Sequence, residues 1–134
     1  MEVSNSFGPI DIAISGMRAQ NKQMEVITSN ATNIHTTDGG SGEPYRRVEA
    51  IFKTEDEGIG GVRLDKIVKD TSDFHRILKP GHPDADESGY VMMPNVDLAT
   101  EMINLNTATR AYQANVAILK RYQKMVETTL ELLR

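Results

Sequence analysis

The sequence predicts a mainly α-helical protein with a small β region, in which the N- and C-terminal helices pair as an antiparallel, coiled-coil-like bundle. Three observations support this fold class. The last third of the chain carries a long apolar stripe at helical spacing, and the first third carries a weaker one. Turn-forming residues and short β-type segments lie between them. Two helices with one apolar stripe each most simply bury the stripes against each other.

The C-terminal helix is predicted over residues 97–134, where no Pro or Gly interrupts the pattern. Its seam positions alternate at spacings of four and three residues, which is the repeat of a coiled-coil helix. They are Leu98, Met102, Leu105, Thr109, Tyr112, Val116, Leu119, Gln123, Val126, Leu130 and Leu133. A helix of this length would run roughly 55 Å at 1.5 Å per residue. Because that exceeds the diameter of a small domain, the length favours an interaction helix over the alternative, an ordinary core helix.

The start of this helix and its polar side also follow from the sequence. Pro94 disfavours a helical conformation of the residue before it, so the helix begins after Pro94. Either Asn95 or Asp97 could cap its N-terminus. The residues between the seam positions are polar or good helix formers, and Glu101 is one of those expected away from the seam.

The N-terminal helix is predicted over residues 10–34, with Pro9 suited to the first helical position. Its apolar positions recur every three or four residues at Ile10, Ala13, Ile14, Met17, Met24, Ile27, Ala31 and Ile34. Gly16 costs about 1 kcal/mol of helix propensity, or marks the close approach of a second helix. The polar residues over 29–33 compete with the helical backbone and predict fraying at the end.

Between the helices the sequence predicts short strands over residues 45–53, 61–69, 74–78 and 90–93, separated by loops. The second of these segments shifts phase, because Val62 and Leu64 share one face whereas Ile67 and Val68 do not keep that alternation. The expected organisation is a helical part, residues 1–36 with 96–134, and a small β and extended-loop part, residues 37–95.

Composition narrows the function. The chain is 39% hydrophobic and 5% aromatic, without Trp, so its core is expected to be aliphatic and modest. No basic patch with interleaved aromatic residues indicates nucleic-acid binding. The absence of Cys excludes disulfides and thiolate chemistry. No apolar run is long enough for membrane insertion. Residues 1–6 lack the pattern of a secretory signal, which predicts a cytoplasmic protein or export without a cleaved signal.

The sequence predicts no catalytic residue, cofactor or metal site. Residues 84–89 copy the first half of a calcium-binding loop, but Asn95 stands where the twelfth-position glutamate is required. His82 lies near several acidic residues without a recognised ligand spacing. Residues 58–61 are rich in glycine but lack the Lys-Ser/Thr ending of a phosphate-binding loop. A turn-forming loop and a surface turn are the simpler readings.

Three stretches resemble one family. Residues 14–20, I-S-G-M-R-A-Q, and 29–33, S-N-A-T-N, are similar to a signature of bacterial flagellar rod and hook proteins, usually G-M-x-A-Q followed by S-N-N-x-A-N. Residues 80–96 resemble a loop of a proximal-rod member of that family, and residues 97–102 with 110–116 resemble its closing helix. Thr32 and His35 depart from the usual pattern.

The resemblance implies a structural subunit of the proximal rod of the flagellar basal body, on the periplasmic side of the inner membrane. It also implies export by the flagellar type III apparatus without a cleaved signal peptide. The implied partners are copies of the chain, other flagellar rod proteins and a FliE-like adaptor at the base of the basal body. The alternative is a soluble coiled-coil adaptor that pairs with a single partner helix and forms a discrete complex rather than a large assembly.

Under either interpretation the helix seams form the assembly interface. Asn30, Asn33, Asn106 and Asn115 would be polar positions that set the register between helices. The residues expected in the interface are Met17, Met24, Asn30, Asn33, Leu98, Met102, Leu105, Tyr112, Asn115, Val116, Leu119, Val126 and Leu130.

Overall fold

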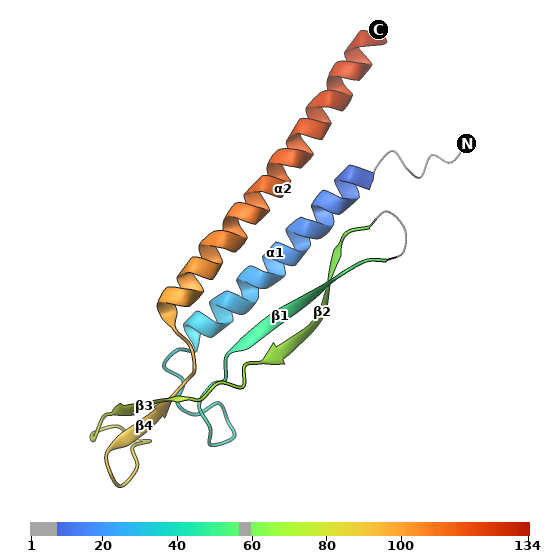
Figure 1. Cartoon of the computed structure of the whole chain (residues 1–134). Coiled ribbons are helices and arrows are strands. Elements are labelled where there is room, and N and C mark those ends of the chain that lie inside the picture. The colour runs from blue at the N-terminus through green and yellow to red at the C-terminus, as the bar shows by residue number, and fades with distance from the viewer. Residues whose placement is uncertain (1–7, 57–59) are drawn as a thin grey trace.

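The computed structural model describes residues 8–56 and 60–134. Along the chain, one long helix comes first, four short strands follow, and a second long helix comes last (Figure 1). The elements are α1 (Gly8–Thr32), β1 (Val48–Thr54), β2 (Val62–Lys69), β3 (His75–Leu78), β4 (Tyr90–Met93) and α2 (Leu98–Leu132). This order confirms the predicted fold class, mainly helical with a small β region.

The two helices lie side by side and run in opposite directions (Figure 1). Asn30, near the end of α1, contacts Glu101 in the first turn of α2, and Met24 contacts Thr109 about two turns further along α2. The predicted antiparallel pairing is therefore confirmed. Because α2 has 35 residues and α1 has 25, the last turns of α2 extend past the beginning of α1.

The strands form two separate antiparallel hairpins. The β1–β2 hairpin lies along α1, and the β3–β4 hairpin lies at the end of the molecule where α1 ends and α2 begins (Figure 1). The register of β1 with β2 shifts between Ile51 and Phe52, so β2 carries an extra residue opposite them. This bulge is the physical form of the phase shift that the sequence predicts between Leu64 and Ile67.

Most element boundaries agree with the predictions, and two differ. β1 begins at Val48 rather than at residue 45, because the backbone N–H of Tyr45 donates to Thr36 and that of Arg47 donates to the Asn95 side chain. α1 ends at Thr32 rather than at residue 34. The polar side chain expected to compete with it, Asn30, bonds to β1 instead.

The N-terminus of α2 is capped by Asp97, whose side chain accepts a hydrogen bond from the backbone N–H of Thr100 at 3.2 Å. Asp97 is one of the two predicted candidates. The other, Asn95, is buried and bonds to Arg47, just before β1, and to the loop before β3. The cap at Asp97 therefore leaves Asn95 free to join α2 to the β region.

The buried core is small and aliphatic, in agreement with the composition. Among the described residues its apolar members are Ala13, Ala19, Val26, Ile27, Val91, Met93, Val96 and Ala108. Three of these are alanines, and α2 contributes only Ala108. A single chain therefore covers little of the apolar surface of its longest helix.

α2 approaches α1 closely at Gly16. A Cβ atom at this position would lie 2.9 Å from the side-chain nitrogen of Asn115 on α2. Real Cβ atoms do not approach a neighbour that closely, so only glycine fits without a shift of the Asn115 side chain. Of the two readings of Gly16, close approach of a second helix is confirmed.

Replacing Gly16 with alanine is expected to destabilise the chain by about 1–3 kcal/mol, because overpacking against Asn115 outweighs the gain in helix propensity. Urea unfolding of the isolated chain measures the change. The second substitution Asn115→Ala removes the clash and should restore most of the loss in the double variant. An equal loss in Gly16→Ala and in the double variant would contradict this explanation.

Candidate assembly interface

The side of α2 that faces α1 differs from the predicted seam. The positions that are buried or half-buried against α1 include Glu101, Leu105, Ala108, Tyr112, Asn115 and Leu119. They keep the predicted spacing of four and three residues and share Leu105, Tyr112 and Leu119 with the predicted seam. Glu101, Ala108 and Asn115 are each one residue earlier in the chain than a predicted seam position. Of those predicted positions, Thr109 and Val116 are half-buried too, whereas Met102 is exposed. α1 thus covers one edge of a stripe that is wider than a single helix can bury.

The apolar residues that α1 does not cover form a surface that we call the open α2 surface. It consists of Leu98, Met102, Ile103, Ile118, Met125, Val126, Leu130, Leu132 and Leu133, all exposed. Two examples are Leu98 in the first turn, 47% exposed, and Leu130 in the last turns, past the beginning of α1, 61% exposed. Exposed apolar side chains in such number on one helix are typical of an interaction surface.

A shallow groove of about 540 Å³ lies on the first half of the same helix. Met102, Leu105 and Thr109 contribute its apolar side, and Arg110 and Gln113 contribute its polar side. The groove therefore follows the predicted seam where α1 leaves it uncovered.

The structure places the predicted interface residues in three environments. Leu98, Met102, Val126 and Leu130 are exposed. Asn30 is buried. The others are half-buried: Met17, Met24, Asn33, Leu105, Tyr112, Asn115, Val116 and Leu119. Asn115 bonds to its own helix at Ala111, and Asn33 bonds to Ser29 and Thr36.

Asn30 makes every hydrogen bond that its amide group can form within its own chain. Its nitrogen donates to the Val48 carbonyl at 2.9 Å and to Glu101 at 3.4 Å. Its oxygen accepts from the Val48 N–H and from the Tyr45 hydroxyl, both at 3.0 Å. The side chain thus pairs with β1 as a neighbouring strand would. Since Asn30 is 1% exposed, it can contribute to an interface between subunits only indirectly.

Glu101 is the residue that sequence reasoning missed. It was expected on the polar side of α2, yet it is 0% exposed. One carboxylate oxygen accepts from Arg47 Nε at 2.6 Å, and the other accepts from Asn30. A buried carboxylate needs such partners because desolvation of an unpaired charge is costly. The helical spacing places residue 101 next to the predicted seam position 102. Its cationic partner Arg47, however, lies 54 residues earlier in the chain, so the local pattern does not reveal the pair.

Arg47 joins this pair to the rest of the β region. Its guanidinium also bonds to Glu49 and, at 3.3 Å, to Asp70, and its backbone N–H donates to Asn95 at 2.8 Å. Burial works to lower the pKa of Arg47, but the hydrogen bonds to Glu49 and Glu101 outweigh it and raise that pKa. Arg47 therefore stays charged. We call Asn30, Arg47, Asn95 and Glu101 the Glu101 cluster.

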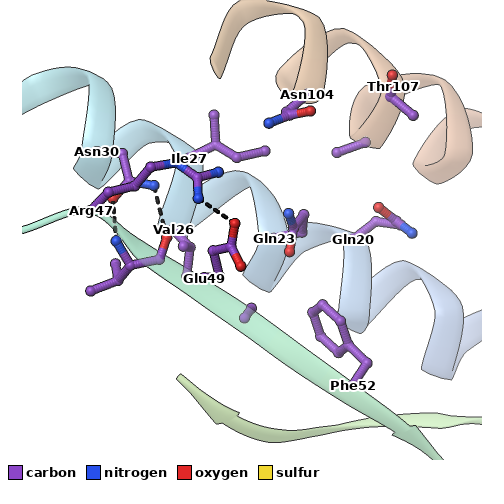
Figure 2. A pocket seen from close by; sticks show the side chains of 13 residues that line it. Gln20, Gln23, Val26, Ile27, Asn30, Arg47, Glu49, Phe52, Asn104 and Thr107 are labelled. Carbon is purple, nitrogen blue, oxygen red and sulfur yellow. Dashed lines mark hydrogen bonds and ion pairs between the residues drawn. The ribbon is translucent and has the colours of Figure 1, made fainter. Parts of the chain in front are cut away.

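Two members of the Glu101 cluster, Asn30 and Arg47, line a groove of about 460 Å³ between α1, β1 and α2. Figure 2 shows Arg47 reaching over Asn30 toward Glu49, with Gln20 and Gln23 from α1 and Asn104 and Thr107 from α2 along the walls. Apolar side chains such as Val26, Ile27 and Phe52 complete the lining, so the groove is partly polar and partly apolar.

The loop that resembles half of a calcium site is held by its own hydrogen bonds. The Asp86 carboxylate accepts from the backbone N–H groups of Ser88 and Tyr90, and it pairs with Arg76 at 3.1 Å. These contacts lower the pKa of Asp86, the bond from Tyr90 most of all. Within the described residues no group of three His, Asp or Glu side chains is placed to hold a metal ion. Residues 84–89 thus form a turn that is held by the Asp86 side chain.

Comparison with known proteins gives one consistent result. Residues 87–132 match the family model described as flagellar basal body rod FlgEFG protein, C-terminal. The flagellar basal-body rod protein FlgC of Salmonella typhimurium is 38% identical, covering 91% of this chain and 93% of the relative. FlgC of Bacillus subtilis is 34% identical over 95% and 97%, and FlgC of Borreliella burgdorferi is 35% identical over 96% and 97%.

Two long terminal helices with a small β region, together with these matches, define a structural protein of the bacterial flagellar basal body rather than an enzyme. More specifically, the chain belongs to the family of the basal-body rod protein FlgC. It is a rod subunit that assembles with other rod components. No helix in the described part of the chain is both long and apolar enough to cross a membrane.

The first prediction for this site concerns the buried ion pair. Arg47→Met leaves the Glu101 carboxylate buried without its cation, which should cost about 3–5 kcal/mol in the free energy of unfolding. Lys53→Met is the matched control, because it breaks the exposed Lys53–Asp65 pair and should cost less than about 1 kcal/mol. Chemical denaturation measures both. Equal small effects would contradict the importance of the buried pair.

The second prediction concerns pH. Hydrogen bonds from the backbone and side chain of Ser72, and then Arg47, lower the pKa of Asp70 from 3.8. A carboxyl group with a lowered folded-state pKa stabilises the fold above its ordinary pKa, and this stabilisation disappears as the pH falls through the lowered value. Asp70→Asn should therefore be less stable than the parent chain at pH 7, and the difference should shrink below pH 3.8. A difference that is constant with pH, in melting experiments, would exclude this linkage.

Proposed function

We propose that the open α2 surface is the surface through which the subunit assembles into the rod. The observation that carries this proposal is the number of large apolar side chains that remain exposed on α2. Several of them lie in its last turns, which extend past the beginning of α1. Burying them against neighbouring subunits would remove apolar surface from water, which is the main driving force of association. A chain whose core is small would gain much of its stability in this way.

The residues proposed to contact neighbours directly are those that are exposed in the single chain: Leu98, Met102, Val126 and Leu130. The half-buried seam residues would complete the contact as a neighbouring helix packs over the groove beside Met102. In an open helical assembly each subunit presents two different surfaces to its neighbours. Thus the contact to the open α2 surface need not come from α2 itself.

The proposed neighbours are copies of the chain, other rod proteins and a FliE-like adaptor at the base, in a proximal rod on the periplasmic side of the inner membrane. Export by the flagellar type III apparatus without a cleaved signal peptide is part of the same proposal and rests on family membership. We also propose that residues 1–36 with 96–134 form the inner, helical part of the subunit and residues 37–95 the outer part.

Leu130→Asp tests the proposal, because Leu130 lies beyond α1 and is exposed in the single chain. The isolated variant should keep its helix content and its resistance to denaturant. Cells that produce the variant should still secrete it, but they should build no complete rods and should not swim. A carboxylate buried in a subunit contact without a partner costs several kcal/mol. Electron microscopy of purified basal bodies and motility assays give the readout.

Arg121→Asp is the control, since Arg121 is an exposed residue on the polar part of the same helix. Its rods should be complete or nearly so. Complete rods in Leu130→Asp cells would refute the assembly surface. A discrete complex with one partner protein, and no rod defect, would favour the adaptor interpretation instead.

A further inference from the structure

The apolar contacts between α1 and α2 do little to fix the position of one helix along the other. The fully buried apolar residues of the two helices are Ala13, Ala19, Val26, Ile27 and Ala108, and three of these are alanines. The row on α2 repeats every seven residues, so a shift of one heptad would bring Leu105 to the level of Tyr112 and Tyr112 to the level of Leu119. Such a shift moves α2 by about 10 Å and leaves an apolar row against α1.

Polar contacts distinguish the observed register from the shifted one. Glu101 meets Arg47 at 2.6 Å and Asn30 at 3.4 Å only in the observed position. After a shift of one heptad its carboxylate would lie near the level of Met24, about 10 Å along the helices from its present partners Arg47 and Asn30. At the other end of the pair, Asn115 packs against the bare backbone of Gly16. The penalty for a wrong register is therefore concentrated in very few residues.

The connection that leads into α2 depends on the same residues. Residues 94–96, immediately before the cap, are buried, and Asn95 accepts from the Arg47 backbone. Asn95 also donates to the Ser72 carbonyl at 3.2 Å. The Glu101 cluster thus holds both the first turn of α2 and the segment that precedes it.

We propose that the Arg47–Glu101 pair is a register lock, which selects one axial position of α2 against α1 rather than adding stability to the fold. A buried ion pair is often no more stabilising than apolar residues of similar size, while single buried polar residues are known to fix the register of paired helices. Through this lock the pair determines the height at which the open α2 surface faces neighbouring subunits. This last clause rests on the proposed function.

The test is a distance measurement in the isolated chain. The chain has no Cys, so Thr28→Cys on α1 and Lys120→Cys on α2 give two unique spin-label sites, both exposed. The parent chain should give one narrow distance distribution. Arg47→Met with Glu101→Leu, which keeps Asn30 and its bonds to β1, should stay folded with an unchanged or higher melting temperature. It should show a second population displaced along the helix axis, by about 10 Å for one heptad.

Replacement of the exposed Lys22–Glu25 pair by Met and Leu is the control, and it should keep the single distance. A single unchanged distance in the Arg47→Met, Glu101→Leu variant would overturn the register lock. A large fall in its melting temperature, or failure to fold, would also overturn it, since the pair would then be a stabilising element. Because the measurement uses the isolated chain, its failure is separate from failure of the rod proposal.

Discussion

The burial of one carboxylate organises this subunit. Glu101 has no access to water, so its charge must be met inside the chain by groups that are fixed in place. Arg47 and Asn30 meet it, and these residues come from the segment before β1 and from the end of α1. Three segments that are far apart in the sequence must therefore converge at one point before α2 can lie against α1. The position of the β region relative to the helices follows from the same contacts.

A polar and alanine-rich contact between the helices has a consequence for the outside of the molecule. α2 contributes Glu101 and Ala108 as its fully buried residues, while its large aliphatic side chains remain exposed. If those side chains filled the intramolecular contact, fewer would remain for other subunits. The directional bonds of the Glu101 cluster and the close approach at Gly16 define the contact without them. Because polar contacts define how α1 and α2 pack, the large aliphatic side chains of α2 remain available for contacts with other subunits.

The sequence predicted what depends on local pattern. The periodicity of both helices, the Asp97 cap, the phase shift at the β2 bulge and the close approach at Gly16 all follow from neighbouring residues. It could not predict what depends on distant partners. One wide stripe on α2 does not reveal which edge α1 covers, so the predicted seam mixed Leu105, which is half-buried, with Leu98, which is exposed. The burial of Glu101 was missed because nothing near it in the sequence indicates Arg47.

Three residues of the N-terminal signature stretches, Ser15, Gly16 and Asn30, make contacts within the subunit. The Ser15 hydroxyl accepts from the Val62 N–H at 3.1 Å and so occupies the start of β2. Gly16 admits Asn115, and Asn30 occupies the start of β1. Each of these positions requires a particular side-chain size or hydrogen-bonding group. An assembly surface such as that on α2 requires mainly apolar character, which many residues can supply. A recognisable motif in such a chain therefore identifies how the subunit folds, while the surface that joins it to its neighbours leaves a weaker trace in the sequence.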